Sequence, residues 1–301
     1  MELSDKKFAV LIDADNISHR KIKDILDEIA NYGTPTIKRI YGDFTDPKFA
    51  AWKSVLLENS ITPIQQYAYT TGKNATDSAL IIDAMDILHK ESVNGFCIVS
   101  SDSDYTRLAS RIRESGREVL GFGEKKTPKP FIKSCDKFIY VEILGQPAPA
   151  PAPVSAPAQT AAAVPAAKAA TPKKNAKKHQ GRNAPETDMP EAAPAEPAAA
   201  EKKVAPAPDT AQPQPIIRPI DDDFKTLLAN TIEDAADDSG WAFLGIVGGV
   251  LTKKMPDFDP RNYGYKKLSL LVKSLSKIVE IEERPSENKE LKLVYVRNRI
   301  R

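Results

Sequence analysis

Residues 8–16, Phe-Ala-Val-Leu-Ile-Asp-Ala-Asp-Asn, decide the fold class of this chain. Their five leading apolar residues, bounded by polar ones, are typical of a strand that is covered on both faces. Two aspartates follow this strand directly, and Asp102 and Asp104 follow a second apolar run at 96–99. Because neighbouring strands of an open parallel α/β sheet end at one crevice, we expect these carboxylates to converge.

Strand and helix patterns alternate through residues 1–145, which we assign to a first domain. Predicted strands lie at 8–12, 36–41, near residue 64, at 96–99 and at 118–122, with an edge strand at 137–142. Predicted helices lie at 22–29, after Asp46 and Pro47, after a capping Thr76, and before Gly116. The alternation predicts an α/β fold with a mainly parallel sheet and flanking helices.

Residues 146–217 differ sharply in composition. They are rich in Ala and Pro, with Lys and Glu interspersed and almost no large apolar residues. Such a segment buries too little apolar surface to fold, so we expect a disordered, extended linker. A basic patch at 173–182 is interpreted as solvated linker, with phosphate binding as the alternative.

Residues 218–301 form a predicted second domain. Apolar residues recur at helical spacing at 224–232, 244–251 and 268–275, and two short strands are expected at 279–282 and 291–296. Three helices followed by a β-hairpin predict a small winged-helix domain of α+β class. We expect Trp241, Phe258 and Tyr263 to belong to its core.

Composition narrows the function. A net charge of +2 over 301 residues gives no global basic field, so nucleic-acid binding would have to come from local patches. Cys97 and Cys135 form neither a disulfide framework nor a metal-binding spacing. No apolar run approaches the roughly 18 residues of a membrane span. We expect a soluble, cytoplasmic protein that does not contact a membrane.

The aspartates at the strand ends suggest a metal site. Carboxylates held close together repel one another unless cations neutralise them, and oxygen-only ligands favour Mg²⁺ or Mn²⁺. Asp13 and the pair Asp102 and Asp104 fit ligation better than a turn or a cap. Asp77 opens the central helix, where the helix dipole would favour an acid in any case. Asn16 could hold a bound water or phosphate oxygen.

Four further residues are secondary candidates. Asp15 fits a helix cap slightly better than a ligand. Lys73 beside Gly72 is either a contact to substrate phosphate or an ordinary exposed lysine. Asp83 follows Asp77 by six residues, which rotates it away from the same helix face. Ser101 adds a hydroxyl to the group at residues 100–104.

This arrangement predicts metal-assisted hydrolysis of a phosphoester. Two divalent ions about 4 Å apart can generate hydroxide from water and stabilise the leaving oxygen without a nucleophilic side chain. His19 and His89 lie on predicted helices and His179 in the linker, so no Ser/His or Cys/His arrangement is expected. The chain has no GxxxxGK[ST] or GxGxxG stretch, which argues against an NTPase or a dinucleotide enzyme.

Four segments of the first domain together resemble the NYN family, a branch of the PIN-like nucleases. They are Val-Leu-Ile-Asp-Ala-Asp-Asn-Ile at 10–17, Gly-Lys-Asn-Ala-Thr-Asp-Ser-Ala-Leu-Ile-Ile-Asp at 72–83, Ile-Val-Ser-Ser-Asp-Ser-Asp-Tyr at 98–105 and Gly-Arg-Glu-Val-Leu-Gly-Phe-Gly at 116–123. The resemblance implies metal-dependent cleavage of RNA. It further implies that Asp13, Asp77, Asp102 and Asp104 are catalytic metal ligands, supported by Asn16. Family members often have Gly after the first aspartate, where Ala14 stands here.

The second domain is similar to the LOTUS or OST-HTH family. The matching segments are Trp-Ala-Phe-Leu at 241–244, Pro-Asp-Phe-Asp at 256–259 and Tyr-Gly-Tyr at 263–265, with Gly248 and a leucine-rich helix. The resemblance implies binding of RNA and, in some members, of protein partners. The candidate phosphate contacts are Lys253, Lys254, Arg261, Lys266, Lys267 and Lys273.

The leading interpretation is a metal-dependent ribonuclease whose second domain presents RNA to the first across the linker. A haloacid-dehalogenase-like phosphatase is a weaker alternative, based on Asp13-Ala14-Asp15. It is weaker because Ile17-Ser18 stand where that family has Thr or Val, and no cap insertion is evident. A third interpretation is a non-catalytic RNA-binding or scaffold protein whose acids hold a structural ion.

Overall fold

The computed structural model describes residues 6–67, 75–145, 217–285 and 292–299. The predicted linker lies outside the described residues as far as residue 216, and so does Lys73. The parts on either side of this linker are described separately.

The N-terminal part is built on a six-stranded sheet with the strand order β3-β2-β1-β4-β5-β6. Every pair of neighbouring strands is parallel. The strands are β1 (Lys7–Asp13), β2 (Thr34–Gly42), β3 (Thr62–Gln65), β4 (Gly95–Val99), β5 (Glu118–Gly123) and β6 (Lys137–Tyr140). The predicted α/β fold with a parallel sheet is confirmed.

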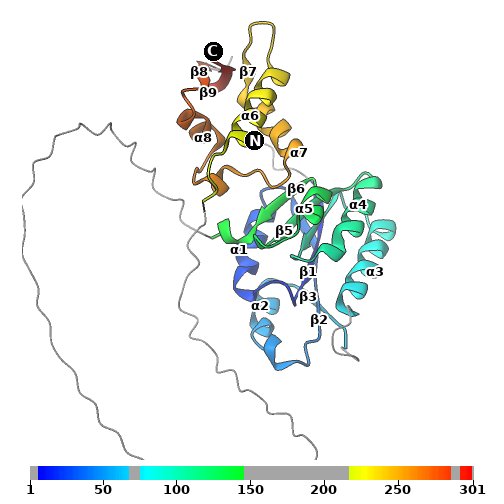
Figure 1. Cartoon of the computed structure of the whole chain (residues 1–301). Coiled ribbons are helices and arrows are strands. Elements are labelled where there is room, and N and C mark those ends of the chain that lie inside the picture. Colours follow the sequence, from blue (N-terminus) through cyan, green and yellow to red (C-terminus); the bar gives the residue numbers. More distant parts are fainter. Residues whose placement is uncertain (1–5, 68–74, 146–216, 286–291, 300–301) are drawn as a thin grey trace, which may run out of the picture. The chain divides into compact units, whose positions relative to one another are not determined.

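Helices cover both faces of this sheet (Figure 1). On one face α1 (Ile22–Ile29) and α2 (Trp52–Glu58) contribute to one hydrophobic cluster, and on the other α3 (Ala75–Lys90), α4 (Thr106–Glu114) and α5 (Lys129–Ser134) contribute to a second. Short 3-10 turns complete the domain: η1 (His19–Lys21), η2 (Pro47–Phe49), η3 (Ser103–Tyr105) and η4 (Val141–Ile143). Because both faces are covered, β1 and β4 are continuous apolar runs rather than alternating ones.

The direction in which strands are added to the sheet reverses between β1 and β4. From β1 the chain builds outward through β2 and β3, and then returns to place β4 on the other side of β1. The two strands are paired from Phe8 with Gly95 to Ile12 with Val99, so their carboxyl ends lie side by side. In open α/β sheets this switch point is the usual ligand site.

The structure differs from the sequence-based prediction of the first domain at two helices. Helix α3 already begins at Ala75, so Thr76 lies inside the helix and does not cap it. Helix α5 was not predicted, because its six residues are too few for a clear periodic pattern and begin with a proline-containing turn.

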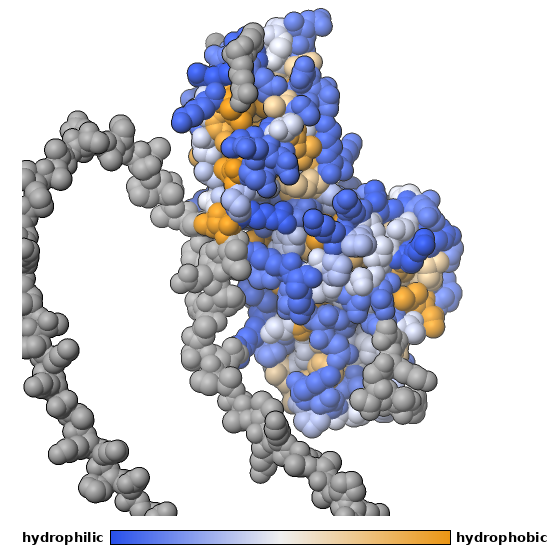
Figure 2. All heavy atoms as spheres, in the orientation of Figure 1, coloured by the Kyte–Doolittle hydropathy of each residue, from blue (hydrophilic) through white to orange (hydrophobic). Residues whose placement is uncertain are grey.

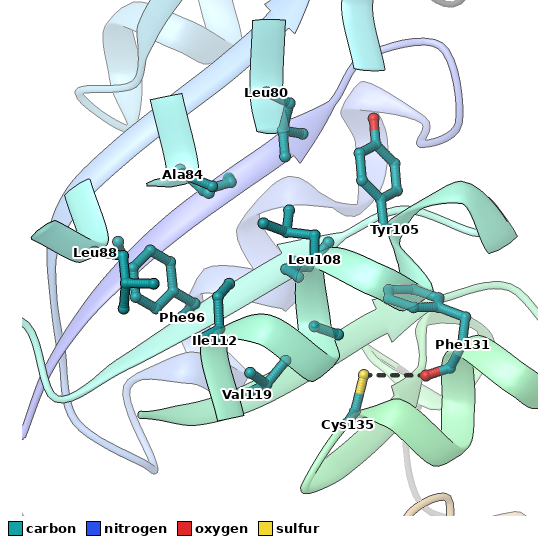
Figure 3. Close-up of a cluster of buried hydrophobic side chains, with 14 of the residues drawn as sticks. Leu80, Ala84, Leu88, Phe96, Tyr105, Leu108, Ile112, Val119, Phe131 and Cys135 are labelled. Atoms are coloured by element: carbon teal, nitrogen blue, oxygen red, sulfur yellow. Dashed lines mark hydrogen bonds between the residues drawn. The ribbon is translucent and has the colours of Figure 1, made fainter. Parts of the chain in front are cut away.

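The apolar cluster under α3 and α4 extends to the carboxyl edge of the sheet (Figure 3). Leu80 and Ala84 from α3 meet Leu108 and Ile112 from α4 over the sheet. Tyr105 lies at one end of this cluster with its ring packed inside it, and its hydroxyl points away from the labelled apolar side chains. The core therefore fixes the position of a polar atom at the edge of the sheet.

The C-terminal part has its own hydrophobic core. It contains α6 (Asp222–Ala235), β7 (Ala242–Phe243), α7 (Leu244–Lys254), η5 (Pro260–Tyr263), α8 (Leu268–Ser274), β8 (Val279–Pro285) and β9 (Lys292–Asn298). The strands form an antiparallel sheet of order β7-β9-β8, which agrees with the predicted helices and hairpin and adds the short β7. Phe258 and Tyr263 are buried as expected, whereas Trp241 is only half-buried and lies outside the core cluster.

The visible surface carries hydrophobic residues singly or in small groups among hydrophilic ones (Figure 2). The large apolar side chains with most exposure are Leu57, Ile82 and Ile246, which belong to different helices. Among the described residues, no helix combines the length and the apolar character that crossing a membrane requires.

Candidate metal centre

Asp13 is the last residue of β1, and its side chain is completely buried. Its Oδ1 accepts a hydrogen bond from the backbone N–H of Asp15 at 3.0 Å. Its Oδ2 accepts from Asn16 Nδ2 at 2.6 Å and from Ser100 Oγ at 3.0 Å. Asn16, predicted as a supporting residue, thus holds the orientation of this carboxylate together with a serine that follows the neighbouring strand.

Asp77, Asp102 and Asp104 place one carboxylate oxygen each within 4.8 Å of one another. Asp77 stands in the first turn of α3. Asp102 caps η3, where its Oδ1 accepts a hydrogen bond from the backbone N–H of Asp104 at 2.9 Å. Asp77 and Asp102 are half-buried and Asp104 is exposed. The structure thus brings together three of the four predicted ligands, from two elements that are distant in sequence.

Tyr105 connects Asp13 to this trio. Its hydroxyl donates to Asp77 Oδ1 at 2.7 Å and lies 3.4 Å from Asp13 Oδ2. Sequence reasoning did not include Tyr105 among the site residues, although it directly follows Asp104. An aromatic residue with a polar tip, placed between a buried strand end and an amphipathic helix, was the available signal.

The electrostatics of the cluster favour a bound cation. Burial raises the pKa of Asp13, although hydrogen bonds from Asn16 and Ser100 act in the opposite direction. Burial also raises the pKa of Asp77, and the negative charges of Asp102 and Asp104 raise it further. Carboxylates whose charged form is disfavoured in this way gain stability when a cation neutralises them.

The donor set fits a hard divalent cation. Three carboxylates from a partly exposed cluster supply oxygen ligands only, which Mg²⁺ and Mn²⁺ prefer, and leave room for water. Asp13 lies beside the trio, and both of its oxygens already accept hydrogen bonds from the chain. A second cation would need Asp13 to exchange some of these bonds for a metal contact.

Asp15 has a different role from the one expected. Its carboxylate accepts a hydrogen bond from Lys48 Nζ at 2.9 Å, and both side chains are largely exposed. The cap of the following η1 is Ser18, so the expectation that Asp15 caps this turn is wrong. Asp15 still adds to the negative charge near Asp77.

Asp83 and Ser101 also have partners of their own. Asp83 pairs with Arg39 and accepts a hydrogen bond from the buried Tyr41 hydroxyl, on the inner side of α3. Ser101 Oγ accepts a hydrogen bond from the backbone N–H of Glu124 at 2.8 Å, which joins the loop after β4 to the end of β5. Both contacts serve the fold directly.

The lysines and arginine predicted to bind RNA fall into two groups. Lys254 pairs with Asp234, Lys273 with Glu283 and Arg261 with Asp259. Lys253, Lys266 and Lys267 are exposed, and they form no ion pair with any residue that the structure describes. The second group therefore has the free charge that contacts to phosphate require.

Comparison with known proteins agrees with both parts of the structure. Residues 7–143 match the NYN domain family, and residues 215–291 match the OST-HTH/LOTUS domain family. The chain therefore contains an NYN domain at residues 7–143 and an OST-HTH/LOTUS domain at residues 215–291. The first is a nuclease-like fold, and domains of the second kind are associated with RNA binding.

Two solved structures are similar to parts of the chain. A crystal structure of a protein of unknown function from Vibrio parahaemolyticus is 20% identical, covers 46% of this chain and 96% of its own, and has a TM-score of 0.39. A solution NMR structure of an uncharacterized protein from Nitrosomonas europaea is 36% identical, covers 35% of this chain and 90% of its own, and has a TM-score of 0.24. No curated protein matches the chain.

Proposed function

We propose that this chain is a ribonuclease that hydrolyses RNA phosphodiester bonds with the help of divalent Mg²⁺ or Mn²⁺, and that it acts in the cytoplasm. The observation that carries the proposal is the meeting of Asp77, Asp102 and Asp104 within 4.8 Å at the switch point of the sheet, beside the buried Asp13. A nuclease-like domain joined to a domain associated with RNA binding supports the same conclusion.

Each residue has a specific task in this proposal. Asp77, Asp102 and Asp104 would hold the cation and, through it, the scissile phosphate. Asn16 and Ser100 keep Asp13 oriented toward the cluster, and the negative charge of Asp13 adds to the attraction for a cation. When bound, a divalent ion supplies Lewis acidity and lowers the pKa of a water molecule.

RNA would enter along the exposed side of the acids. Asp104 is exposed, and next to Asp15 and Lys48 lies a hollow of about 240 Å³ that also borders His19 and Trp52. Of the predicted acids only Asp15 lines this hollow, and its size would suit a nucleotide that flanks the scissile phosphate. Lys48 is the cation at its rim that would meet a phosphate.

The phosphatase alternative is disfavoured by the surroundings of Asp13. That chemistry needs one oxygen of Asp13 to attack phosphorus, and therefore an accessible carboxylate. Asp13 is completely buried, and hydrogen bonds from the backbone of Asp15, from Asn16 and from Ser100 occupy both of its oxygens. We therefore assign Asp13 to the support of the metal centre.

The test is cleavage of end-labelled single-stranded and structured RNA by the purified full chain, with Mn²⁺, with Mg²⁺ and with EDTA. Asp102→Asn is compared with Asp86→Asn, which removes one carboxylate from the exposed side of α3, where Asp86 pairs with Lys90 and with no other residue that the structure describes. We expect metal-dependent cleavage that Asp102→Asn reduces by at least about 100-fold and that Asp86→Asn leaves intact.

Two outcomes would contradict the proposal. Cleavage that continues in EDTA, or that survives in Asp102→Asn, would place the activity elsewhere. RNA binding without cleavage in either metal would leave the non-catalytic RNA-binding interpretation, in which the acids hold a structural ion.

A further inference from the structure

The small sheet of the C-terminal domain has one face in the core and one toward solvent. Ala242, Val296 and Ile281 are paired neighbours in this sheet and belong to the core or pack against it. Because side chains alternate along a strand, the residues adjacent to them point to the other face. That outer face carries Phe243, Glu280, Glu282, Arg284, Tyr295 and Arg297, all half-buried or exposed.

Aromatic rings and guanidinium groups lie in contact on this outer face. The Cζ atom of Arg284 lies 4.4 Å from the ring centre of Tyr295 and 5.2 Å from that of Trp241. The Cζ atom of Arg297 lies 4.7 Å from the Trp241 ring, and the rings of Phe243 and Tyr295 are 5.8 Å apart. We call these five residues the stacking face: three aromatic rings and two guanidinium groups, with Arg284 in contact with both Tyr295 and Trp241, and all five partly open to solvent.

The stacking face is close to neutral in charge. Arg297 pairs with Glu280 at 2.7 Å and Arg284 with Glu282 at 3.1 Å. Glu280 lies on the strand next to that of Arg297, whereas Glu282 and Arg284 belong to the same strand, β8. These acids largely compensate the charge of the two arginines. Such a face offers flat surfaces for contact rather than a positive electrostatic field. It differs in this respect from the exposed Lys253, Lys266 and Lys267, whose charges are not paired with any residue that the structure describes.

We propose that the stacking face binds single-stranded RNA by stacking unpaired bases against Tyr295, Trp241 and the guanidinium groups. Every base has a flat π face, and aromatic and arginine planes are the protein surfaces that match it. The proposal rests on the RNA-binding role of this domain and not on cleavage. It assigns base contacts to the sheet, and leaves phosphate contacts to the exposed lysines.

The two kinds of contact differ in their response to salt. Contacts to phosphate release counterions, so each one lost flattens the dependence of affinity on salt by about 0.7 in the log–log slope for a single strand. Stacking on a neutral face releases few ions. Variants of the stacking face should therefore weaken binding equally at low and high salt.

The experiment uses the full chain carrying Trp52→Phe, which leaves Trp241 as its single tryptophan. Because Trp52 borders the hollow of the N-terminal domain, anisotropy of labelled RNA first establishes that this variant binds RNA as the natural sequence does. Fluorescence is followed while single-stranded 12-mers of U or of A are added in EDTA, which prevents metal-dependent cleavage. A base stacked on Trp241 should quench its emission with the same midpoint that anisotropy of the labelled RNA gives. A merely structural Trp241 would not respond in this way.

Matched variants locate the contacts. Tyr295→Leu and Arg284→Met should each weaken RNA binding by about tenfold with an unchanged salt slope. Lys292→Met removes a charge from the same strand on the opposite face and should have no effect. Lys266→Met/Lys267→Met should weaken binding and flatten the salt slope. Thermal melting of each variant establishes that the domain is still folded.

Three results would overturn the proposal. In the first, Trp241 emission stays unchanged at RNA concentrations that saturate binding. In the second, folded Tyr295→Leu and Arg284→Met bind RNA as the parent does. In the third, neither oligonucleotide binds, which would favour a protein as the partner of this face while leaving the cleavage test of the N-terminal domain unaffected.

Discussion

The hydroxyl of Tyr105 donates a hydrogen bond to Asp77 at 2.7 Å and lies 3.4 Å from the carboxylate of Asp13. A hydroxyl has one proton, so it serves one of these acids at a time. Its ring is completely buried in the core under α3 and α4, which fixes the oxygen in place. The hydrophobic core thus sets the spacing between the end of β1 and the start of α3, where the acids meet.

Tyr105→Phe should weaken divalent-metal binding by roughly tenfold, because it removes the hydroxyl that fixes the positions of the Asp77 and Asp13 carboxylates relative to each other. The cost in stability should be about 1 kcal/mol, the value of one hydrogen bond. Metal affinity is measured from the rise in melting temperature along a Mn²⁺ titration. The matched control is Tyr41→Phe, which removes a buried hydroxyl that bonds to Asp83 outside the acidic trio. Equal loss of metal affinity in both variants would contradict a specific role for Tyr105.

Asp77→Asn should make the metal-free protein more stable at neutral pH. Burial and the neighbouring carboxylates raise the pKa of Asp77, so the folded state binds a proton more tightly than the unfolded state does. The metal-free fold is therefore favoured as pH falls through this raised pKa and loses that stability as pH rises. We expect an increase in melting temperature of about 2–4 °C for Asp77→Asn in EDTA at pH 7, and no stabilisation by Mn²⁺.

The pH dependence checks this explanation. The difference between the parent and Asp77→Asn in EDTA should shrink as pH falls, because protonation neutralises the parent carboxylate. Stabilisation of the parent by Mn²⁺ should weaken over the same range, since ligands must be deprotonated to bind metal. A lower melting temperature for Asp77→Asn than for the parent, in EDTA at pH 7, would show that the charge of Asp77 does not destabilise the metal-free fold.

Asp83→Ala should destabilise the fold without changing the metal centre. It leaves the guanidinium of Arg39 and the buried hydroxyl of Tyr41 without their acceptor, at a cost of about 1–3 kcal/mol. Urea unfolding measures the loss, and the Mn²⁺ titration should give the parent affinity. Asp83→Asn retains an acceptor for one of these partners, so its free energy of unfolding should lie between those of the parent and of Asp83→Ala. Loss of metal binding in a folded Asp83→Ala would restore Asp83 as a ligand candidate.

Asp15→Asn should affect cleavage far less than Asp102→Asn. The carboxylate of Asp15 pairs with Lys48, both side chains are largely exposed, and such pairs contribute about 0–1 kcal/mol. We expect an unchanged melting temperature, an unchanged response to Mn²⁺ and cleavage within about threefold of the parent. A loss of metal response as large as that of Asp102→Asn would instead make Asp15 a ligand.

The pattern of apolar and polar residues was sufficient to predict the elements whose burial follows from their own sequence. The apolar run before Asp13 and the run at 96–99 became adjacent buried strands, and the acids after them reached the same edge. Pattern failed at short or unusual segments. Helix α5 has only six residues, β7 has two, and α3 begins before the residue expected to cap it. In such segments neighbouring contacts outweigh local preference.

The sequence by itself determined the parallel α/β class, the second small domain and the placement of acids at strand ends, because periodicity and strand boundaries are local properties. Only the tertiary structure decided the partners of each side chain. Asp83 forms an ion pair with Arg39 and Asp15 forms one with Lys48. The Tyr105 hydroxyl donates a hydrogen bond to Asp77. The stacking face joins residues at β7 to residues of the β8–β9 hairpin, which follows it only after α7 and α8. Such pairings depend on helix rotation and strand register, which packing of the whole domain fixes.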